Sequence, residues 1–228
     1  MIRWDAVDTV LLDMDGTLLD LAYDNTLWMD VLPRRYSETH GVSLESAREH
    51  LFGHMEACKG ELDFYCLDYW AEFTGLDVVA LHRELAALIR YRPHAEAFLD
   101  HLLVMERRTV LVTNAHRASL TVKNLHSNLT SRVHGAVSCH DYGAPKESQA
   151  FWEALMREHP FDPNRTLIID DNAAVLDSAR AFGVAHVLTI VQPDSGRPPR
   201  TGLKHPAVED FRDLIRARSA ESPDVERQ

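Results

Sequence analysis

The sequence predicts an α/β fold: a Rossmann-like, doubly wound parallel sheet core with an inserted α-helical cap domain. Two observations indicate this fold. After residue 92, short apolar segments alternate with helices, and this alternation favours right-handed crossovers in a parallel sheet that is covered on both faces. Residues 20–91 interrupt the alternation with a wholly helical pattern. We therefore expect a core of residues 1–19 and 92–216 and a cap of residues 20–91.

The first predicted strand is the segment AVDTVLL at residues 6–12, which is short and apolar and leads into the acidic turn DMDGT. In the cap segment, apolar side chains recur at spacings of three and four residues, as at Trp28, Val31 and Leu32, and glycines separate the runs. This periodicity predicts about four helices.

The remaining core elements follow Pro93, which suits the first turn of a helix. Helices are predicted at 93–106, 118–126, 147–159 and 173–182, and Gly183 suits the end of the last one. Strands are predicted at 109–113, 135–138, 166–169 and 184–191. A final amphipathic helix is predicted at 206–216, and residues 217–228 are polar enough to form a flexible tail.

The composition narrows the class of protein. The chain has 228 residues, with 24 Lys and Arg against 35 Asp and Glu, and a net charge of −11. Nucleic-acid binding usually needs a basic surface, so we expect no nucleic-acid partner. No apolar run approaches the roughly 20 residues of a membrane span, and the first residues do not resemble a signal peptide. We expect a cytoplasmic protein that does not bind membranes.

Two groups of residues have side chains that can bind zinc, but their spacing does not predict a zinc site. Cys58, Cys66 and Cys139 are far apart and lack a CxxC spacing, so we expect reduced thiols rather than disulfides or a zinc site. His50 and His54 have the i, i+4 spacing of a zinc pair, but no third ligand follows nearby. An exposed helix face is the simpler interpretation of these histidines.

Polar side chains follow four of the predicted strands, and in chain order they are Asp13 and Asp15, then Thr113 and Asn114, then Lys146, then Asp170 and Asp171. Because ligands bind at the carboxyl ends of parallel strands, we expect these groups to meet at one edge of the sheet. Crowded carboxylates repel one another unless a cation lies among them, and oxygen ligands suit Mg²⁺. The hydroxyl, amide and ammonium groups beside them suit a phosphate dianion.

Each piece has a simpler explanation when it is taken alone. A carboxylate at a strand end is usually a helix N-cap, and Thr-Asn after a strand is often only a turn. All four pieces in order at successive strand ends are much harder to explain in this way, and they indicate one site.

The segment DMDGTL at residues 13–18, Thr113-Asn114, Lys146 and Asp170-Asp171 resemble, in order, the four signature motifs of the haloacid dehalogenase superfamily. The resemblance implies a Rossmann-like core with a helical cap after the first motif. It implies that Asp13 is the nucleophile and Asp15 the general acid and base. It further implies that Thr113, Asn114 and Lys146 bind the phosphoryl group, and that Mg²⁺ is held by Asp13, the Asp15 carbonyl and Asp171, with Asp170 bound to it directly or through water.

The second aspartate of the first motif, Asp15, is absent from the dehalogenases of the superfamily, so the resemblance implies a phosphatase or phosphotransferase. Longer stretches, among them the segments FYCLDYW, LVTNAH and YGAPKE, resemble its purine 5′-nucleotidases, which hydrolyse GMP and IMP. The expected partner is thus a small phosphorylated metabolite, a purine nucleoside monophosphate. Asn172 departs from the pattern, since serine is usual there.

Other functions stay open at this point. A sugar-phosphate phosphatase or a phosphoglucomutase-like phosphotransferase would share the core motifs and differ in what the cap admits. A receiver-type signalling domain also carries acids, Thr and Lys at the ends of a doubly wound sheet, but it is usually much shorter and has no cap. A binding protein without activity would be expected to lack Asp13 or Asp15.

Several polar and aromatic residues near the motifs have no assigned role. Asp20, Asp24 and Asn25 lie where the chain enters the cap and can serve the hinge, the cap or the substrate. His116 and the turn at residues 193–196 lie close to the predicted edge of the site. The cap segment also contains an aromatic stripe, which consists of Phe64, Tyr65, Tyr69, Trp70 and Phe73. Such a stripe typically forms the core of its own helical layer. Because this stripe covers more than one helix face, one or two of its rings can reach the cleft.

Overall fold

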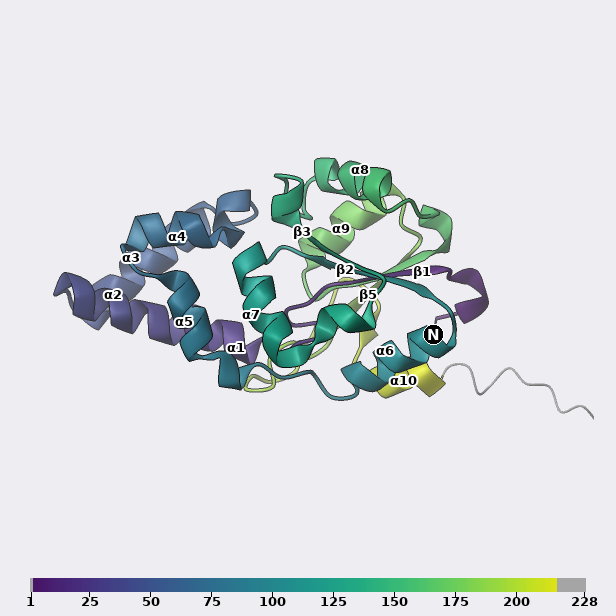
Figure 1. The fold of residues 1–228 in the computed structure, drawn as a ribbon, viewed down its shortest axis with the longest axis horizontal. Helices are drawn as coiled ribbons and strands as arrows, with labels where there is room; N and C mark the ends of the chain where they lie inside the picture. The colour runs from purple at the N-terminus through teal and green to yellow at the C-terminus, as the bar shows by residue number, and fades with distance from the viewer. Residues whose placement is uncertain (1, 217–228) are drawn as a thin grey trace, which may run out of the picture.

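The fold is seen in a computed structural model that describes residues 2–216 (Figure 1). A six-stranded sheet has the strand order β3-β2-β1-β4-β5-β6, and every neighbouring pair is parallel. The strands are β1 (Thr9–Leu12), β2 (Arg108–Thr113), β3 (Gly135–Ser138), β4 (Thr166–Ile169), β5 (His186–Ile190) and β6 (Ala207–Val208). The predicted α/β fold with a parallel sheet is confirmed.

Helices cover both faces of the sheet, because alternate residues of each strand point to opposite sides. On one side Val10 and Leu12 of β1 pack in a cluster with α6 (Ala95–Val104), α7 (Arg117–Ser127) and α10 (Phe211–Arg216). On the other side Leu11 packs in a cluster with α8 (Gln149–Glu158) and α9 (Ala173–Phe182). The carboxyl ends of the strands therefore lie between two packed layers.

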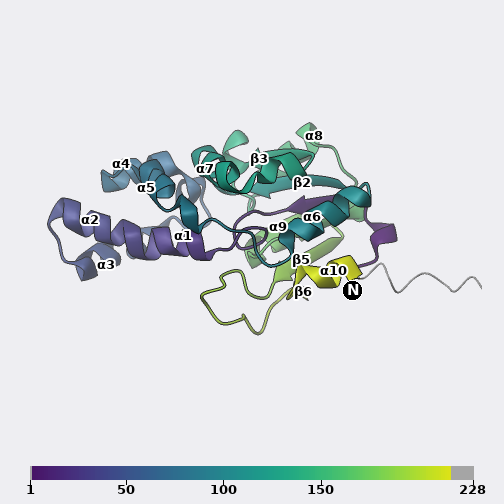
Figure 2. The same ribbon diagram turned by 60° about the horizontal axis from the view of Figure 1, so that its bottom comes forward.

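The chain between β1 and β2 forms the helical insert that the sequence predicts, and it lies at one end of the sheet (Figures 1 and 2). Its first rod joins α1 (Ala22–Thr26), a π turn (Leu27–Val31) and α2 (Leu32–His40). Pro33 follows this turn. Because proline has no backbone N–H, the helical hydrogen bond that residue 33 would donate to this turn is missing. The insert then continues through α3 (Leu44–Ala57), α4 (Leu67–Thr74) and α5 (Val78–Glu84).

The insert has a hydrophobic core of its own, which includes Leu27, Leu51 and Trp70. Backbone hydrogen bonds join the segments that cross between insert and sheet: Arg92 N donates to Leu18 O at 2.8 Å, and Asp20 N donates to Arg90 O at 3.0 Å. These contacts lie at the predicted limits of the cap. The limits themselves, residues 20 and 91, stay a prediction.

The predicted ends of several core elements are wrong. The helix expected at 93–106 spans Ala95–Val104, so Pro93 lies before it and not in its first turn. The helix expected at 206–216 begins only at Phe211, because Ala207–Val208 pairs with β5 as the edge strand of the sheet. The strand expected at 6–12 begins at Thr9, since Trp4–Ala6 forms a 3₁₀ turn. The expected tail at 217–228 lies outside the described residues. Within residues 2–216, no helix combines the length and the apolarity that a membrane crossing requires.

Candidate active site

The turn after β1 brings the first motif against the last one. Asp13 N donates to Ile169 O at 3.0 Å, which continues the pairing of β1 with β4. Gly16 has a φ of 79°, and a Cβ there would lie 2.9 Å from Asp171 Cγ. The left-handed conformation and the lack of a side chain let this turn approach Asp171 closely. The acids of two strand ends therefore share one small volume.

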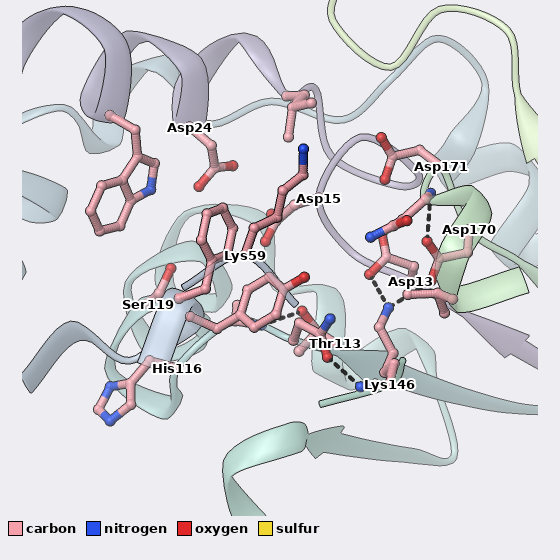
Figure 3. Close-up of a pocket in the computed structure, with 18 of the residues that line it drawn as sticks. Asp13, Asp15, Asp24, Lys59, Thr113, His116, Ser119, Lys146, Asp170 and Asp171 are labelled. Carbon is pink, nitrogen blue, oxygen red and sulfur yellow. Dashed lines mark hydrogen bonds and ion pairs between the residues drawn. The ribbon is translucent and has the colours of Figure 1, made fainter. Parts of the chain in front are cut away.

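Lys146 lies at the centre of the site (Figure 3). Its Nζ is 2.6 Å from Asp13 Oδ1 and 2.6 Å from Asp170 Oδ2, and it donates to Val112 O at 3.1 Å. Burial lowers the pKa of Lys146, but the two carboxylates outweigh this effect and the net shift is upward. The amine is thus a buried, positively charged anchor between the first and the last motif.

The three carboxylates of Asp13, Asp170 and Asp171 each offer an oxygen within 4.8 Å of the others. Asp13 Oδ2 is buried and has no hydrogen-bond partner among the described residues. Burial raises the pKa of all three groups, in the case of Asp170 to about 7. An all-oxygen donor set with an unsatisfied buried atom fits a hard divalent cation.

The second motif holds the loop that carries Lys146. Asn114 Oδ1 accepts the Lys146 backbone N–H at 2.9 Å, and Asn114 Nδ2 donates to Glu147 Oε2 at 2.9 Å. Thr113 lies beside Asn114 on the cavity wall and is 1% exposed. Both ends of the Asn114 amide therefore order the loop of the third motif.

Glu147 joins the cap to this core loop, although its sequence context did not mark it as a site residue. Its Oε1 accepts hydrogen bonds from Tyr65 of the cap at 2.7 Å and from Asn172 at 3.0 Å. Asn172, the departure from the usual serine, thus serves the same carboxylate as Tyr65. The only feature of the sequence that could have indicated a role for Glu147 is its position next to Lys146.

A second buried lysine was also missed. Lys123 of α7 is 1% exposed, and its Nζ lies 2.7 Å from Asp15 Oδ1 and 2.7 Å from Asp24 Oδ1. Burial and the charge of Asp24 raise the pKa of Asp15 to about 6, although Lys123 opposes this shift. Lys123 therefore links Asp15 of the core with Asp24 of the cap. The available signal was weak: Lys123 lies three residues after the buried Leu120 on the same helix.

Replacing this lysine should impair both activity and stability. Lys123→Met leaves Asp15 and Asp24 buried without their cation, and breaking a buried ion pair commonly costs about 3 to 5 kcal/mol. We expect the free energy of unfolding to fall by this order and kcat to fall at least about tenfold, because Asp15 loses its positioning partner. Denaturant unfolding and steady-state kinetics measure the two effects. Lys123→Arg keeps the charge and should be less harmful; equal losses in both variants would contradict the electrostatic role.

A cavity of about 670 Å³ is lined by these groups and by side chains of the insert. Asp13, Thr113 and Lys146 line its core side. Its cap side is aromatic and includes Trp28, Phe64, Tyr65 and Trp70. Three rings of the predicted aromatic stripe thus reach the cleft.

The other two rings of the stripe, Tyr69 and Phe73, do not line the cavity; they stack on His54, with ring centroids 5.7 and 3.8 Å from it. His50 is exposed and stacks on Phe73 at 5.0 Å. Both histidines of the i, i+4 pair are thus engaged with rings of α4.

The polar residues where the chain enters the cap have two different roles: two of them bind the turn at residues 193–196, and the third lines the cavity. Asp20 is 4% exposed and accepts hydrogen bonds from Ser195 N at 3.0 Å and Arg90 Nε at 3.2 Å, so it ties the crossing segments to the turn at 193–196. Asn25 Nδ2 donates to Asp194 Oδ2 of the same turn at 2.6 Å. Asp24, by contrast, lines the cavity (Figure 3). Its carboxylate pairs with Lys123.

A parallel sheet with a helical insert after its first strand, and an Asp–Lys–Asp cluster at the strand ends, define a hydrolase of the haloacid dehalogenase type. The sequence pattern of the haloacid dehalogenase-like hydrolases matches residues 7–183, and the chain belongs to this family.

Within the family, the chain is 40% identical over 214 residues to the Escherichia coli (strain K12) protein named GMP/IMP nucleotidase YrfG, covering 94% of this chain and 96% of the relative. The protein of the same name from Shigella flexneri matches with the same identity and coverage.

Solved structures share the fold at low sequence identity. A phosphatase of this type from Thermococcus onnurineus superposes with a TM-score of 0.77 at 18% identity, covering 92% of this chain and 97% of that chain. The L-2-haloacid dehalogenase from Xanthobacter autotrophicus, with chloropropionic acid covalently bound, gives a TM-score of 0.58 at 14% identity, covering 95% and 100%. At these identities the similarity supports the fold and nothing finer.

Proposed function

We propose that this hydrolase is a Mg²⁺-dependent phosphomonoesterase that cleaves purine 5′-nucleotides such as GMP and IMP to the nucleoside and phosphate. The observation that carries this proposal is the arrangement of Asp13 and Asp15 on one turn beneath an aromatic cavity, in a chain 40% identical to a protein named a GMP/IMP nucleotidase. Asp13 is the nucleophile, Asp15 is the general acid and base, and Lys146 neutralises the phosphoryl oxygens.

In the first step the Asp13 carboxylate attacks phosphorus in line, the P–O5′ bond breaks, and Asp15 donates a proton to the leaving oxygen. In the second step Asp15 takes a proton from a water molecule that attacks the aspartyl phosphate, which releases phosphate and restores the Asp13 carboxylate. Two easier displacements replace one difficult displacement. The charged groups of both steps line the core side of the cavity.

The carboxylates of Asp13, Asp170 and Asp171, with the backbone carbonyl of Asp15, would hold the Mg²⁺ ion. When bound, the ion supplies positive charge to the phosphoryl oxygens and reduces repulsion between substrate and enzyme carboxylates. Thr113 and Asn114 border the same space and supply hydrogen-bonding groups to the phosphate. The core residues thus bind only the phosphate group, and residues of the cap determine the specificity for the rest of the substrate.

The cap side of the cavity suits a purine base. Phe64 and Tyr65 line the cavity and are only partly buried, so they can contact a base, and a volume of about 670 Å³ lies in the usual range of small-molecule sites. Lys59 also lines the cavity from the cap (Figure 3). An ammonium donor matches the O6 acceptor of guanine and hypoxanthine, whereas adenine carries an amino donor at that position.

A substrate panel tests the proposal. We expect kcat/KM for GMP and IMP to exceed that for AMP, CMP, UMP and glucose 6-phosphate by about tenfold to a hundredfold, because an unpaired polar group costs about 1 to 3 kcal/mol. Lys59→Met should reduce the preference for GMP over AMP, while Lys59→Arg should largely keep it. Preference for a sugar phosphate would leave the phosphatase chemistry intact and reject the nucleotidase assignment. Absence of phosphomonoesterase activity would reject both.

A further inference from the structure

Beside the cavity lies a second cluster of metal-binding side chains. Cys66, His116 and His140 each offer one ligand atom, and these three atoms lie within 4.8 Å of one another. Cys66 directly precedes α4 in the cap, His116 directly precedes α7, and His140 lies in the 3₁₀ turn after β3. The cluster thus joins three segments that are far apart in the sequence, and none of its members belongs to the Asp–Lys–Asp site.

The side chains are in a state that can accept an ion. Cys66 is a free thiol and half-buried. His140 Nε2 is buried without a hydrogen-bond partner among the described residues. The rings of His116 and His140 meet edge to face, with centroids 4.8 Å apart.

We propose that Cys66, His116 and His140 bind a zinc ion, with Asp68 as the fourth ligand. One sulfur and two imidazole nitrogens form the mixed donor set that zinc prefers, whereas Mg²⁺ prefers oxygen. Asp68 Oδ2 lies 3.7 Å from His116 Nε2, and its side chain is 83% exposed and can rotate toward the ion.

The geometry needs only a small adjustment. Bonds of about 2.0 to 2.3 Å in a tetrahedral zinc site separate the ligand atoms by about 3.3 to 3.8 Å. Ligand atoms within 4.8 Å of one another therefore have to close by at most about 1 to 1.5 Å, which is within reach of side-chain rotation. His116 Nδ1 accepts a long hydrogen bond of 3.3 Å from Ala118 N, and its ring can turn as the ion binds.

The position of the site gives the ion a defined effect. Cys66 and Asp68 belong to the cap, whereas His116 and His140 belong to the core, so the ion would connect the two across the edge of the cavity. His116 lines the cavity and lies two residues after Asn114 of the phosphate-binding loop. Zinc at this site would hold the cap against the core beside the phosphate-binding loop.

The test uses the full chain, free of any affinity tag and stripped of metal, with excess Mg²⁺ present to fill the aspartate site. Titration with Co²⁺ should give one bound equivalent, a thiolate-to-cobalt charge-transfer band in the near ultraviolet, and the strong visible bands of a tetrahedral site. Zn²⁺ should displace the cobalt. Cys66→Ser should lose the charge-transfer band, and His140→Ala should weaken Co²⁺ binding at least tenfold. Cys58→Ser alters another free thiol of the cap and should leave both unchanged.

Two results would overturn the zinc site: a wild-type protein without the charge-transfer band, or a band that persists in Cys66→Ser. An independent measurement covers the case in which the histidine variant does not fold. Zn²⁺ should slow alkylation of Cys66 in the wild-type protein at least tenfold, as followed by peptide mass spectrometry, without slowing that of Cys58. Equal rates with and without Zn²⁺ would also contradict the proposal.

Discussion

Asp13→Asn should abolish turnover and leave the fold intact. The two side chains have nearly the same shape, but the amide is neither a nucleophile nor an anionic metal ligand, so both functions proposed for this position are lost together. We expect kcat to fall at least about a thousandfold. Steady-state hydrolysis of GMP measures the loss, and circular dichroism with the melting temperature checks the fold.

Asp213→Asn is a matched control for this variant, because Asp213 is an exposed carboxylate on α10 and lines no part of the cavity. It should keep the wild-type rate. Rapid quenching of the wild-type enzyme during turnover, followed by peptide mass spectrometry, should locate the phosphoryl group on Asp13. Near wild-type activity of Asp13→Asn, or a phosphorylated aspartate elsewhere, would show that the covalent mechanism is wrong.

Removal of divalent cations should lower activity at least about a hundredfold, and Mg²⁺ should restore it. Without a cation, the crowded carboxylates of Asp13, Asp170 and Asp171 repel both one another and a phosphate dianion. Ca²⁺ should restore activity poorly, because it prefers longer bonds and more ligands than Mg²⁺ does. The measurement is the hydrolysis rate against free Mg²⁺ concentration after exhaustive chelation.

This experiment also separates the two metal sites. Recovery on Mg²⁺ alone identifies the ion that the chemistry needs, while bound zinc is counted independently by elemental analysis. Asp171→Asn should raise the Mg²⁺ concentration needed for half-maximal activity, since it removes one anionic oxygen donor. Full activity after chelation, confirmed by metal analysis, would exclude the metal-dependent mechanism.

The parts of the site that could be predicted from the sequence are those that local patterns define. Asp13, Asn114 and Asp170 each lie at or just after the end of a short apolar strand, and parallel strands end at the same edge of a sheet. Strand existence and strand direction are therefore enough to bring these residues together. Local periodicity also distinguished the helical insert from the alternating core, and Gly183 ended α9 as expected, with a φ of 111°.

Contacts between distant segments could not be predicted in this way. Lys123 meets Asp24, 99 positions away, and its spacing on α7 is equally typical of a solvent-exposed lysine. Residues 207–208 pair with β5 although their own sequence fits the start of a helix, because the free edge of the sheet supplies hydrogen bonds that a local pattern does not contain.

The sequence by itself determined the fold class, the family and the chemical identity of the groups at the strand ends, since each depends on residue type and on spacing within a short segment. The tertiary structure alone decided which side chains from the cap and the core meet. It set Lys123 between Asp15 and Asp24, placed Phe64 and Tyr65 on the wall of the cavity, and gathered Cys66, His116 and His140. The physical reason is that such meetings depend on how two separately packed layers dock, and that geometry results from many weak contacts summed over both surfaces.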